Sequence, residues 1–243
     1  MPADGLRLDD VTLVRGTRRV FERLTLHLRE RRIGLIGDNG AGKSSLFRLL
    51  CGLDRPDAGR VWVHGLDTTS ERRQLPRHIG LMFQNPDDQI IFPTVAEELA
   101  FSLMAQGAAR AEARAQAKAF LAQRGLSDWA GRAVGELSQG QRQQVCLLAL
   151  QICSPRTLLL DEPFASLDLP SQARLSAQLA ATEQQVVVST HQLDTVRDFE
   201  RVLWLADGQV RADGSGPTVC AAYVDDVRAR ADAEPPRHGA SHA

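Results

Sequence analysis

Lysine is nearly absent from this chain, although basic residues are common. Of the 29 basic residues only Lys43 and Lys118 are lysine, so a lysine within a glycine-rich segment is expected to have a specific role. The chain also has no run approaching the ~18 apolar residues of a membrane-spanning helix. It begins without the basic and apolar segments of a secretory signal. We therefore expect a soluble, cytosolic protein without direct membrane insertion, which would work at a membrane by docking onto another protein.

Close cysteine pairs and a strong net charge are absent as well. The four cysteines are scattered along the chain, which argues against a zinc site or a redox motif. The formal net charge is −1, so no overall electrostatic attraction favours nucleic acid or an anionic membrane surface. Any partner must be recognised locally.

Apolar residues indicate an α/β fold. In the first thirty residues they alternate on either side of Arg15-Gly16-Thr17, which predicts two antiparallel strands joined by a turn. From Arg32 onward, short apolar runs alternate with helical segments, and this alternation predicts a parallel sheet covered on both faces. The expected strands are 32–36, 157–161 and 185–190, and the expected helices are 43–51, 170–181 and 192–199.

The middle and the end of the chain have different compositions. Residues 94–153 are rich in Ala, Leu, Gln, Glu and Arg, which predicts a helical sub-domain, roughly 90–155, inserted into the sheet domain. Asp207-Gly208 predicts a hairpin between two short strands. The expected organisation is one domain over 1–227, followed by a tail over 228–243 whose composition predicts disorder.

A glycine-rich segment directly follows the predicted strand 32–36. Gly37 to Ser44 reads GDNGAGKS, the phosphate-binding pattern of two spaced glycines followed by Lys and Ser. The glycines let backbone N–H groups face a concavity, and the following helix adds its positive end. Lys43 supplies a charge for the β- and γ-phosphates, and Ser44 is placed to ligate Mg²⁺. A plain strand-to-helix turn is the alternative. We expect ATP to be bound through Gly37, Asp38, Asn39, Gly40, Ala41, Gly42, Lys43, Ser44 and Ser45.

Two further segments carry polar groups at places where ligands bind. Asp161-Glu162 follows an apolar strand, at the sheet edge where open α/β folds bind ligands. Asp161 is expected to hold Mg²⁺ through water, and Glu162 to orient and deprotonate the attacking water. The segment 137–141, LSQGQ, precedes a helix predicted over 141–153 and offers a second anion site. Taken singly, the first could be an acidic helix start and the second an ordinary capped helix.

Six motifs together resemble those of the ATP-binding cassette (ABC) ATPases, over residues 6 to about 222. They occur in the family's order and approximate spacing: the phosphate loop, Gln84, the signature LSQGQ, Asp161-Glu162, Ser166-Leu167-Asp168 and His191. The resemblance implies a P-loop NTPase (RecA-like) core with an N-terminal antiparallel β sub-domain and an inserted helical sub-domain. It also implies a head-to-tail dimer, in which each ATP lies between the phosphate loop of one subunit and Ser138, Gly140 and Gln141 of the other.

The resemblance assigns roles to several residues. Gln84 would touch Mg²⁺ and the lytic water, His191 would contact the γ-phosphate, and Asp168 would bridge the subunits. The expected catalytic residues are Lys43, Gln84, Glu162 and His191, and the expected Mg²⁺ ligands are Ser44, Gln84 and Asp161. The chain departs from the family at Gln139, where glycine is usual, and at Arg15, near which the family commonly has an aromatic residue that stacks on adenine.

A finer resemblance begins at Gln84. The hexapeptide QNPDDQ, followed by Phe92-Pro93-Thr94-Val95, is similar to the ATPases of energy-coupling-factor (ECF) importers of vitamins and metal ions, and the short chain most resembles those of biotin importers. This implies an ATPase at the cytoplasmic face of the membrane, bound to a transmembrane coupling protein and a substrate-binding membrane protein. We expect a homodimer, because one chain supplies every required motif, and we expect no nucleic-acid partner. The resemblance also places Asp87-Asp88 beside the groove for the coupling protein, although a plain turn is the alternative.

Two other functions remain open from the sequence. A soluble ABC ATPase, such as one serving iron–sulfur cluster assembly, would have a single domain of this size. A chromosome-maintenance or DNA-repair ATPase would need a long coiled coil, and 94–153 has no sustained heptads.

Overall fold

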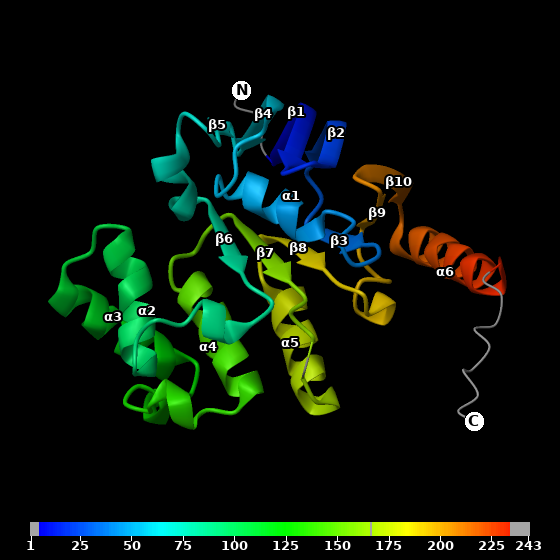
Figure 1. Ribbon diagram of the computed structural model, residues 1–243. Coiled ribbons are helices and arrows are strands. Elements are labelled where there is room, and N and C mark those ends of the chain that lie inside the picture. The colour runs from blue at the N-terminus through cyan, green and yellow to red at the C-terminus, as the bar shows by residue number, and fades with distance from the viewer. Residues whose placement is uncertain (1–4, 166, 234–243) are drawn as a thin grey trace, which may run out of the picture.

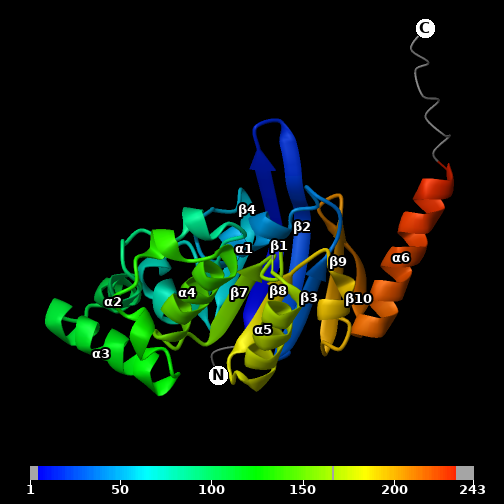
Figure 2. The same cartoon turned by 90° about the horizontal axis from the view of Figure 1, so that it is seen from below.

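Two β-sheets enclose the first helix of the chain (Figure 1). The computed structural model describes residues 5–165 and 167–233. In Figure 1 the antiparallel sheet lies above the parallel sheet, and in both views α2 and α3 lie on the side away from α6 (Figures 1 and 2).

The antiparallel sheet has the strand order β2-β1-β4-β5. Along its first hairpin, Leu6 pairs with Leu28 and Leu8 with Leu26, so alternate side chains turn toward the core. The hairpin predicted around Arg15-Gly16-Thr17 is confirmed. The strands are β1 (Leu6–Arg15), β2 (Arg18–Leu28), β4 (Ala58–Val63) and β5 (Leu66–Asp67).

The second sheet has the order β10-β9-β3-β8-β7-β6, and β10 alone runs antiparallel to its neighbour. The predicted parallel sheet and the hairpin at Asp207-Gly208 are therefore confirmed. The strands are β3 (Arg32–Ile36), β6 (Ile79–Met82), β7 (Thr157–Asp161), β8 (Gln185–Ser189), β9 (Arg201–Ala206) and β10 (Gln209–Gly214).

The central strands are buried on both faces because helices cover both sides of the sheet. Leu159 packs in a cluster with α1 (Lys43–Leu50), on the side of the antiparallel sheet. Its neighbours Leu158 and Leu160 point the opposite way and pack with side chains from α4, α5 and α6. Those helices span Gln139–Gln151, Leu169–Ala181 and Gly216–Ala233.

The predicted helical sub-domain consists of α2 (Val95–Ala105), α3 (Arg110–Gln123) and α4. It has its own apolar core, in which Leu99, Leu121 and Leu148 pack together. The face of α4 that carries Leu147 instead contributes to the core of the parallel sheet. This helix therefore joins the two cores.

Two local predictions are wrong. The expected helix 192–199 is reduced to the 3₁₀ turn Leu193–Thr195. The N–H groups of Thr195 and Val196 donate to the carbonyls three residues earlier, so the backbone forms i→i+3 turns in place of α-helical bonds, and the Thr195 hydroxyl also donates to the carbonyl of Gln192.

The second error concerns the tail. Residues 228–233 are not disordered, because they continue α6, where Arg230 pairs with Asp226 one turn earlier and with Asp38 of the phosphate loop. The expected domain end at 227 thus falls within a helix. Residues 234–243 of the predicted tail lie outside the described residues.

A buried carboxylate fixes the entry to the helical sub-domain. Glu98 of α2 is 4% exposed, and its Oε2 accepts from the N–H groups of Ile91 and Phe92, at 2.9 Å each.

We expect Glu98→Ala to lower the free energy of unfolding by about 1–3 kcal/mol, because both donors lose their acceptor. Glu98→Gln keeps an acceptor oxygen and should lose less. Urea denaturation followed by circular dichroism measures both, and equal losses would contradict this role of Glu98.

Candidate functional site

The glycine-rich loop adopts a backbone that requires glycine at particular positions. Gly37, Gly40 and Gly42 have φ of 142°, 79° and 107° between β3 and α1. A Cβ at Gly37 would lie 2.1 Å from the carbonyl oxygen of Leu205, and one at Gly42 would lie 2.8 Å from the ring of Phe21. The loop is therefore pressed against β9 on one side and β2 on the other, with the N-terminus of α1 at its end.

Lys43 is folded back into this loop. The residue is 8% exposed, and its Nζ donates to the carbonyl oxygens of Gly37 at 2.6 Å and Asp38 at 3.1 Å. Burial lowers the pKa of Lys43, while the negative charges of Glu162 and Asp161 oppose that shift. The loop thus holds a desolvated ammonium group beside two carboxylates.

Glu162 lies on a backbone turn directly after β7. Its φ of 49° is left-handed, and its N–H donates to the carbonyl of Ser189 at the end of β8. This turn holds the carboxylate beside His191, whose Nδ1 lies 2.9 Å from Glu162 Oε2. The Glu162 side chain is 10% exposed and that of His191 is 62% exposed. The pair therefore presents the imidazole to the open side and the carboxylate to the interior.

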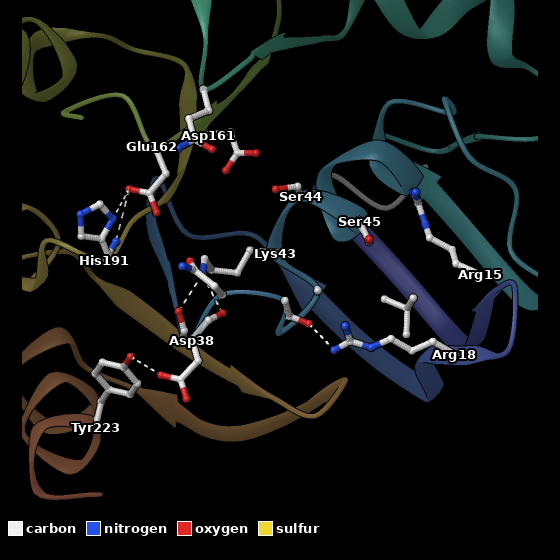
Figure 3. Close-up of a pocket in the computed structure, with 16 residues that line it drawn as sticks. Arg15, Arg18, Asp38, Lys43, Ser44, Ser45, Asp161, Glu162, His191 and Tyr223 are labelled. Carbon is white, nitrogen blue, oxygen red and sulfur yellow. Dashed lines mark hydrogen bonds and ion pairs between the residues drawn. The ribbon is translucent and has the colours of Figure 1, made fainter. Parts of the chain in front are cut away.

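A cleft of about 640 Å³ collects the predicted residues at the carboxyl ends of the parallel strands (Figure 3). Ligands bind at this edge in open α/β folds. Ala41 lines instead a smaller cavity of about 250 Å³, which lies against β9, β10 and α6. The predicted residues that line the cleft are Gly37, Asp38, Asn39, Gly40, Gly42, Lys43, Ser44, Ser45, Gln84, Asp161, Glu162 and His191.

The residues predicted to act on the opposite subunit lie elsewhere. Ser138, Gly140, Gln141 and Asp168 line a separate cavity of about 270 Å³ between α4 and α5. Ser138 and Gln141 form a capping box at the start of α4, in which the Ser138 hydroxyl accepts from the Gln141 N–H at 3.3 Å. The helix-cap geometry is therefore present, and a nucleotide contact made by these residues stays a prediction.

Asp168 caps the next helix. Its carboxylate accepts from the N–H of Ser171 at 2.9 Å, and hydrogen bonds from Ser171 lower the pKa of Asp168. Ser166, which belongs to the same predicted motif, lies outside the described residues.

Sequence reasoning missed three residues of the cleft: Arg18, Val20 and Tyr223. Arg18 donates to the carbonyl of Gly40 at 2.7 Å, and the Tyr223 hydroxyl donates to Asp38 at 2.7 Å. The hairpin pattern around Arg18 indicated a strand and gave no sign of which side chains face the loop. Tyr223 is the one tyrosine of the chain, and no local motif marks it.

The cleft fits a Mg²⁺ ion that is shared with phosphates. Ser44, Gln84 and Asp161 all line it and offer oxygen ligands, which Mg²⁺ prefers. Within 5–165 and 167–233, no three His, Cys, Asp or Glu side chains group into a metal site of their own. The remaining ligands would therefore come from nucleotide phosphates and water.

Comparison with known proteins identifies the class. The sequence model of the ABC transporter family matches residues 21–165. The chain therefore belongs to the ABC transporter family, and it is an ATP-binding and ATP-hydrolysing member of it. Within the described residues, none of the helices has both the length and the apolar character that crossing a membrane requires.

Two individual relatives share a large part of this sequence, and both carry the name of a biotin transport ATP-binding protein. The biotin transport ATP-binding protein BioM of Rhodobacter capsulatus is 48% identical over 92% of this chain and 95% of its own length. The protein of the same name from Rhizobium etli is 38% identical over 86% of this chain and 92% of its own length. Both similarities extend over nearly the whole relative.

Solved structures share the fold. The structure of cbiO1 from Clostridium perfringens, described as part of the ABC transporter complex cbiONQ, covers 97% of both chains with a TM-score of 0.77 and 23% identity. A dimeric ATP-binding cassette in a post-hydrolysis state, bound to ADP and Pi, covers 86% of this chain and 98% of its own, with a TM-score of 0.74 and 24% identity. The predicted fold, a P-loop NTPase core with an antiparallel β sub-domain and a helical sub-domain, is confirmed.

Arg15 lines the cleft, and it stands near the position at which the family commonly has an aromatic residue. Figure 3 shows Arg15 and Arg18 on one side of the phosphate loop and Tyr223 on the other. The Arg15 guanidinium forms an ion pair with Asp54, whose carboxylate also binds Arg48. Arg15 is therefore held by charge pairing, and Tyr223, on the other side of the loop, is the one Phe, Tyr or Trp among the described residues that line the cleft.

We expect this site to discriminate only modestly between ATP and GTP. Arg15→Tyr should lower the KM for ATP by roughly fivefold or more, because stacking a base on an aromatic ring is worth about 1–3 kcal/mol, and a fixed base sharpens the preference for ATP. Turnover of ATP and of GTP, by the unmodified chain and by the Arg15→Tyr variant, measures this discrimination. The control is Arg19→Tyr, because Arg19 pairs with Val14, on the opposite face of the hairpin from Arg15, and does not line the cleft. A strong ATP preference in the unmodified chain would mean that another group recognises the base.

Proposed function

We propose that this protein is the ATPase subunit of an ABC importer of the energy-coupling-factor type, in which a homodimer couples hydrolysis of MgATP to uptake of a small solute. One observation carries the proposal. A single cleft contains a phosphate loop with a buried lysine, two carboxylates and a histidine. Binding groups for a triphosphate and a base for an attacking water are thus combined at one sheet edge.

The loop supplies the binding energy for the phosphates. Its N–H groups and the N-terminus of α1 attract anions, and the ammonium of Lys43 exchanges loop carbonyls for β- and γ-phosphate oxygens. Ser44, Gln84 and Asp161 would hold a Mg²⁺ ion, which when bound would neutralise part of the phosphate charge. Lys43 and the loop then orient the γ-phosphate toward Glu162.

Glu162 is the proposed general base. Its carboxylate takes a proton from the water that attacks the γ-phosphate, and Gln84, which lines the same cleft, orients that water. His191, which pairs with Glu162 at 2.9 Å, keeps the carboxylate in position and contacts the γ-phosphate with its exposed ring. Both residues stand at strand ends, which fixes their backbone.

Glu162→Gln tests the base directly. The amide keeps the shape of the carboxylate but takes no proton, so we expect hydrolysis to fall by ~10²–10⁴ while ATP still binds. The ATP-bound dimer should accumulate, and size-exclusion chromatography should detect it. Glu183→Gln, in the exposed loop before β8, is the control. Near-normal turnover of the Glu162 variant would mean that another group activates the water.

A head-to-tail homodimer is the second element of the proposal. In one chain the cavity lined by Ser138, Gly140 and Asp168 is separate from the cleft. In the proposed dimer the signature of a second copy covers the cleft of the first, so that two ATP molecules lie at the interface. Support comes from the dimeric, ADP-bound cassette with the same fold.

The membrane partner is proposed to dock beside the helical sub-domain. A groove of about 430 Å³ is lined by Ile90, Ile91, Phe92, Pro93, Ala133, Val134 and Gly135, with Asp87 at its side. Ile91 is 71% exposed, which is costly for a large apolar side chain unless a partner covers it. An amphipathic cytoplasmic helix that carries arginine fits this combination of apolar floor and acidic edge.

This docking would hold the ATPase at the cytoplasmic face of the membrane, through a transmembrane coupling protein that works with a substrate-binding membrane protein. The two biotin transport relatives favour biotin as the solute over a metal ion. They also favour an importer over a soluble ABC ATPase of iron–sulfur cluster assembly.

Charge reversal of Asp87 and Asp88 tests the docking surface. Both are exposed and follow the Asn85 cap of a short 3₁₀ helix, and Asp87 Oδ1 lies 3.3 Å from Arg142 Nε. Removing one partner of a partly desolvated ion pair costs ~2–5 kcal/mol, so Asp87→Lys with Asp88→Lys should abolish co-purification with membrane proteins and uptake.

ATP binding by the isolated subunit should stay intact in this variant. Glu112→Lys is the matched control, because α3 contributes no residue to the groove. If the doubly reversed protein assembles and supports uptake as well as the control, then the acidic pair is only a solvated turn.

A further inference from the structure

The phosphate loop contains a negative charge where a triphosphate is expected. Asp38 is its second residue and lines the cleft, with its side chain 51% exposed. A carboxylate near phosphate oxygens repels them, at a cost that grows as water is excluded. Unless it is compensated and turned away, Asp38 weakens the site to which it belongs.

Two side chains of α6 compensate this charge. The Tyr223 hydroxyl donates to Asp38 Oδ1 at 2.7 Å, and Arg230 Nη1 donates to Oδ2 at 2.6 Å (Figure 3 shows the Tyr223 bond). The Arg230 guanidinium, followed by the Tyr223 hydroxyl, holds the pKa of Asp38 below its ordinary value. Burial and the bond to Asp38 raise the pKa of Tyr223 to about 12, so its hydroxyl stays a donor.

The sheet in turn fixes these two side chains. Arg230 Nε binds Asp226 at 2.8 Å, and Asp226 binds Arg211 of β10 at 2.9 Å. The Tyr223 ring packs edge-on against Trp204 of β9, with ring centroids 5.3 Å apart. Figures 1 and 2 both show α6 along the edge of the parallel sheet at β9 and β10. A continuous set of contacts therefore runs from the sheet through α6 to Asp38.

We propose that α6 positions the phosphate loop for nucleotide binding, with Tyr223 and Arg230 acting through the Asp38 carboxylate. The helix neutralises the charge of Asp38, draws its carboxylate away from the bound phosphates and fixes the first turn of the loop. The contact is made by residues far along the chain: Tyr223 lies 185 positions after Asp38, and Arg230 lies 192 positions after it. The last turns of α6 thus belong to the nucleotide site.

The test uses the full chain and steady-state hydrolysis of MgATP. Arg230→Gln and Tyr223→Phe should each raise the KM for ATP about three- to tenfold and leave kcat within about twofold, because a positioning contact acts on binding and not on the attacking water. Added salt should reduce the effect of Arg230→Gln, since it screens the exposed carboxylate. Arg230→Lys should recover part of the loss.

Arg228→Gln is the matched control, because this arginine lies on the same helix with its side chain 76% exposed and 3.9 Å from Asp225. Its KM should equal that of the unmodified chain. Circular dichroism and thermal melting establish that α6 stays folded in each variant.

A double-mutant cycle decides whether Asp38 carries the effect. In an Asp38→Asn background no carboxylate needs compensation, so Arg230→Gln should change the KM by less than twofold. An equal effect of Arg230→Gln in both backgrounds would overturn the proposal, and so would an unchanged KM in both single variants. Failure of the unmodified chain to hydrolyse MgATP would instead count against the proposed function.

Discussion

Parallel pairing of β6, β7, β8 and β3 is the constraint on which the site depends. These strands run in the same direction, so their carboxyl ends meet at one edge of the sheet. The phosphate loop follows β3, Gln84 follows β6, Glu162 follows β7 and His191 follows β8. Gly37 and His191, which are 154 positions apart in the chain, thereby share one cleft, and no single segment could supply these groups together.

The loop itself is shaped by contact with its neighbours as much as by its glycines. The carbonyl of Leu205 and the ring of Phe21 occupy the space that side chains at Gly37 and Gly42 would need. Lys43 is kept inside by carbonyls of the same loop, so a binding phosphate replaces existing polar contacts without first having to strip water from a free ammonium. Pre-organisation of this kind reduces the entropy lost on binding.

Much of this arrangement could be predicted from the sequence, because the decisive signals are local. The strands 32–36 and 157–161 were predicted to the residue, since each is a short apolar run that ends in a motif. The helix expected at 192–199 is replaced by a 3₁₀ turn whose backbone bonds span three residues, and the Thr195 hydroxyl competes for the carbonyl of Gln192.

The end of α6 could not be predicted, because Ala, Arg and Asp occur equally in disordered tails and the partner of Arg230, Asp38, lies far away in the chain. Tyr223 enters the cleft for the same non-local reason. The cleft contains the predicted residues of the phosphate loop except Ala41, together with Gln84, Asp161, Glu162 and His191, but their chemical roles and the contact with a second copy stay predictions.

The placement of α1 between the two sheets has a thermodynamic consequence. Leu46, Phe47, Leu49 and Leu50 of this helix are nearly inaccessible and pack against both sheets, while its first residues face the cleft. Unfolding either sheet would release α1 and destroy the anion site at its N-terminus. A nucleotide at 100 times its Kd therefore adds about 2.7 kcal/mol to the stability of both sheets together. Occupancy of the cleft and folding of the antiparallel sheet are thus linked equilibria.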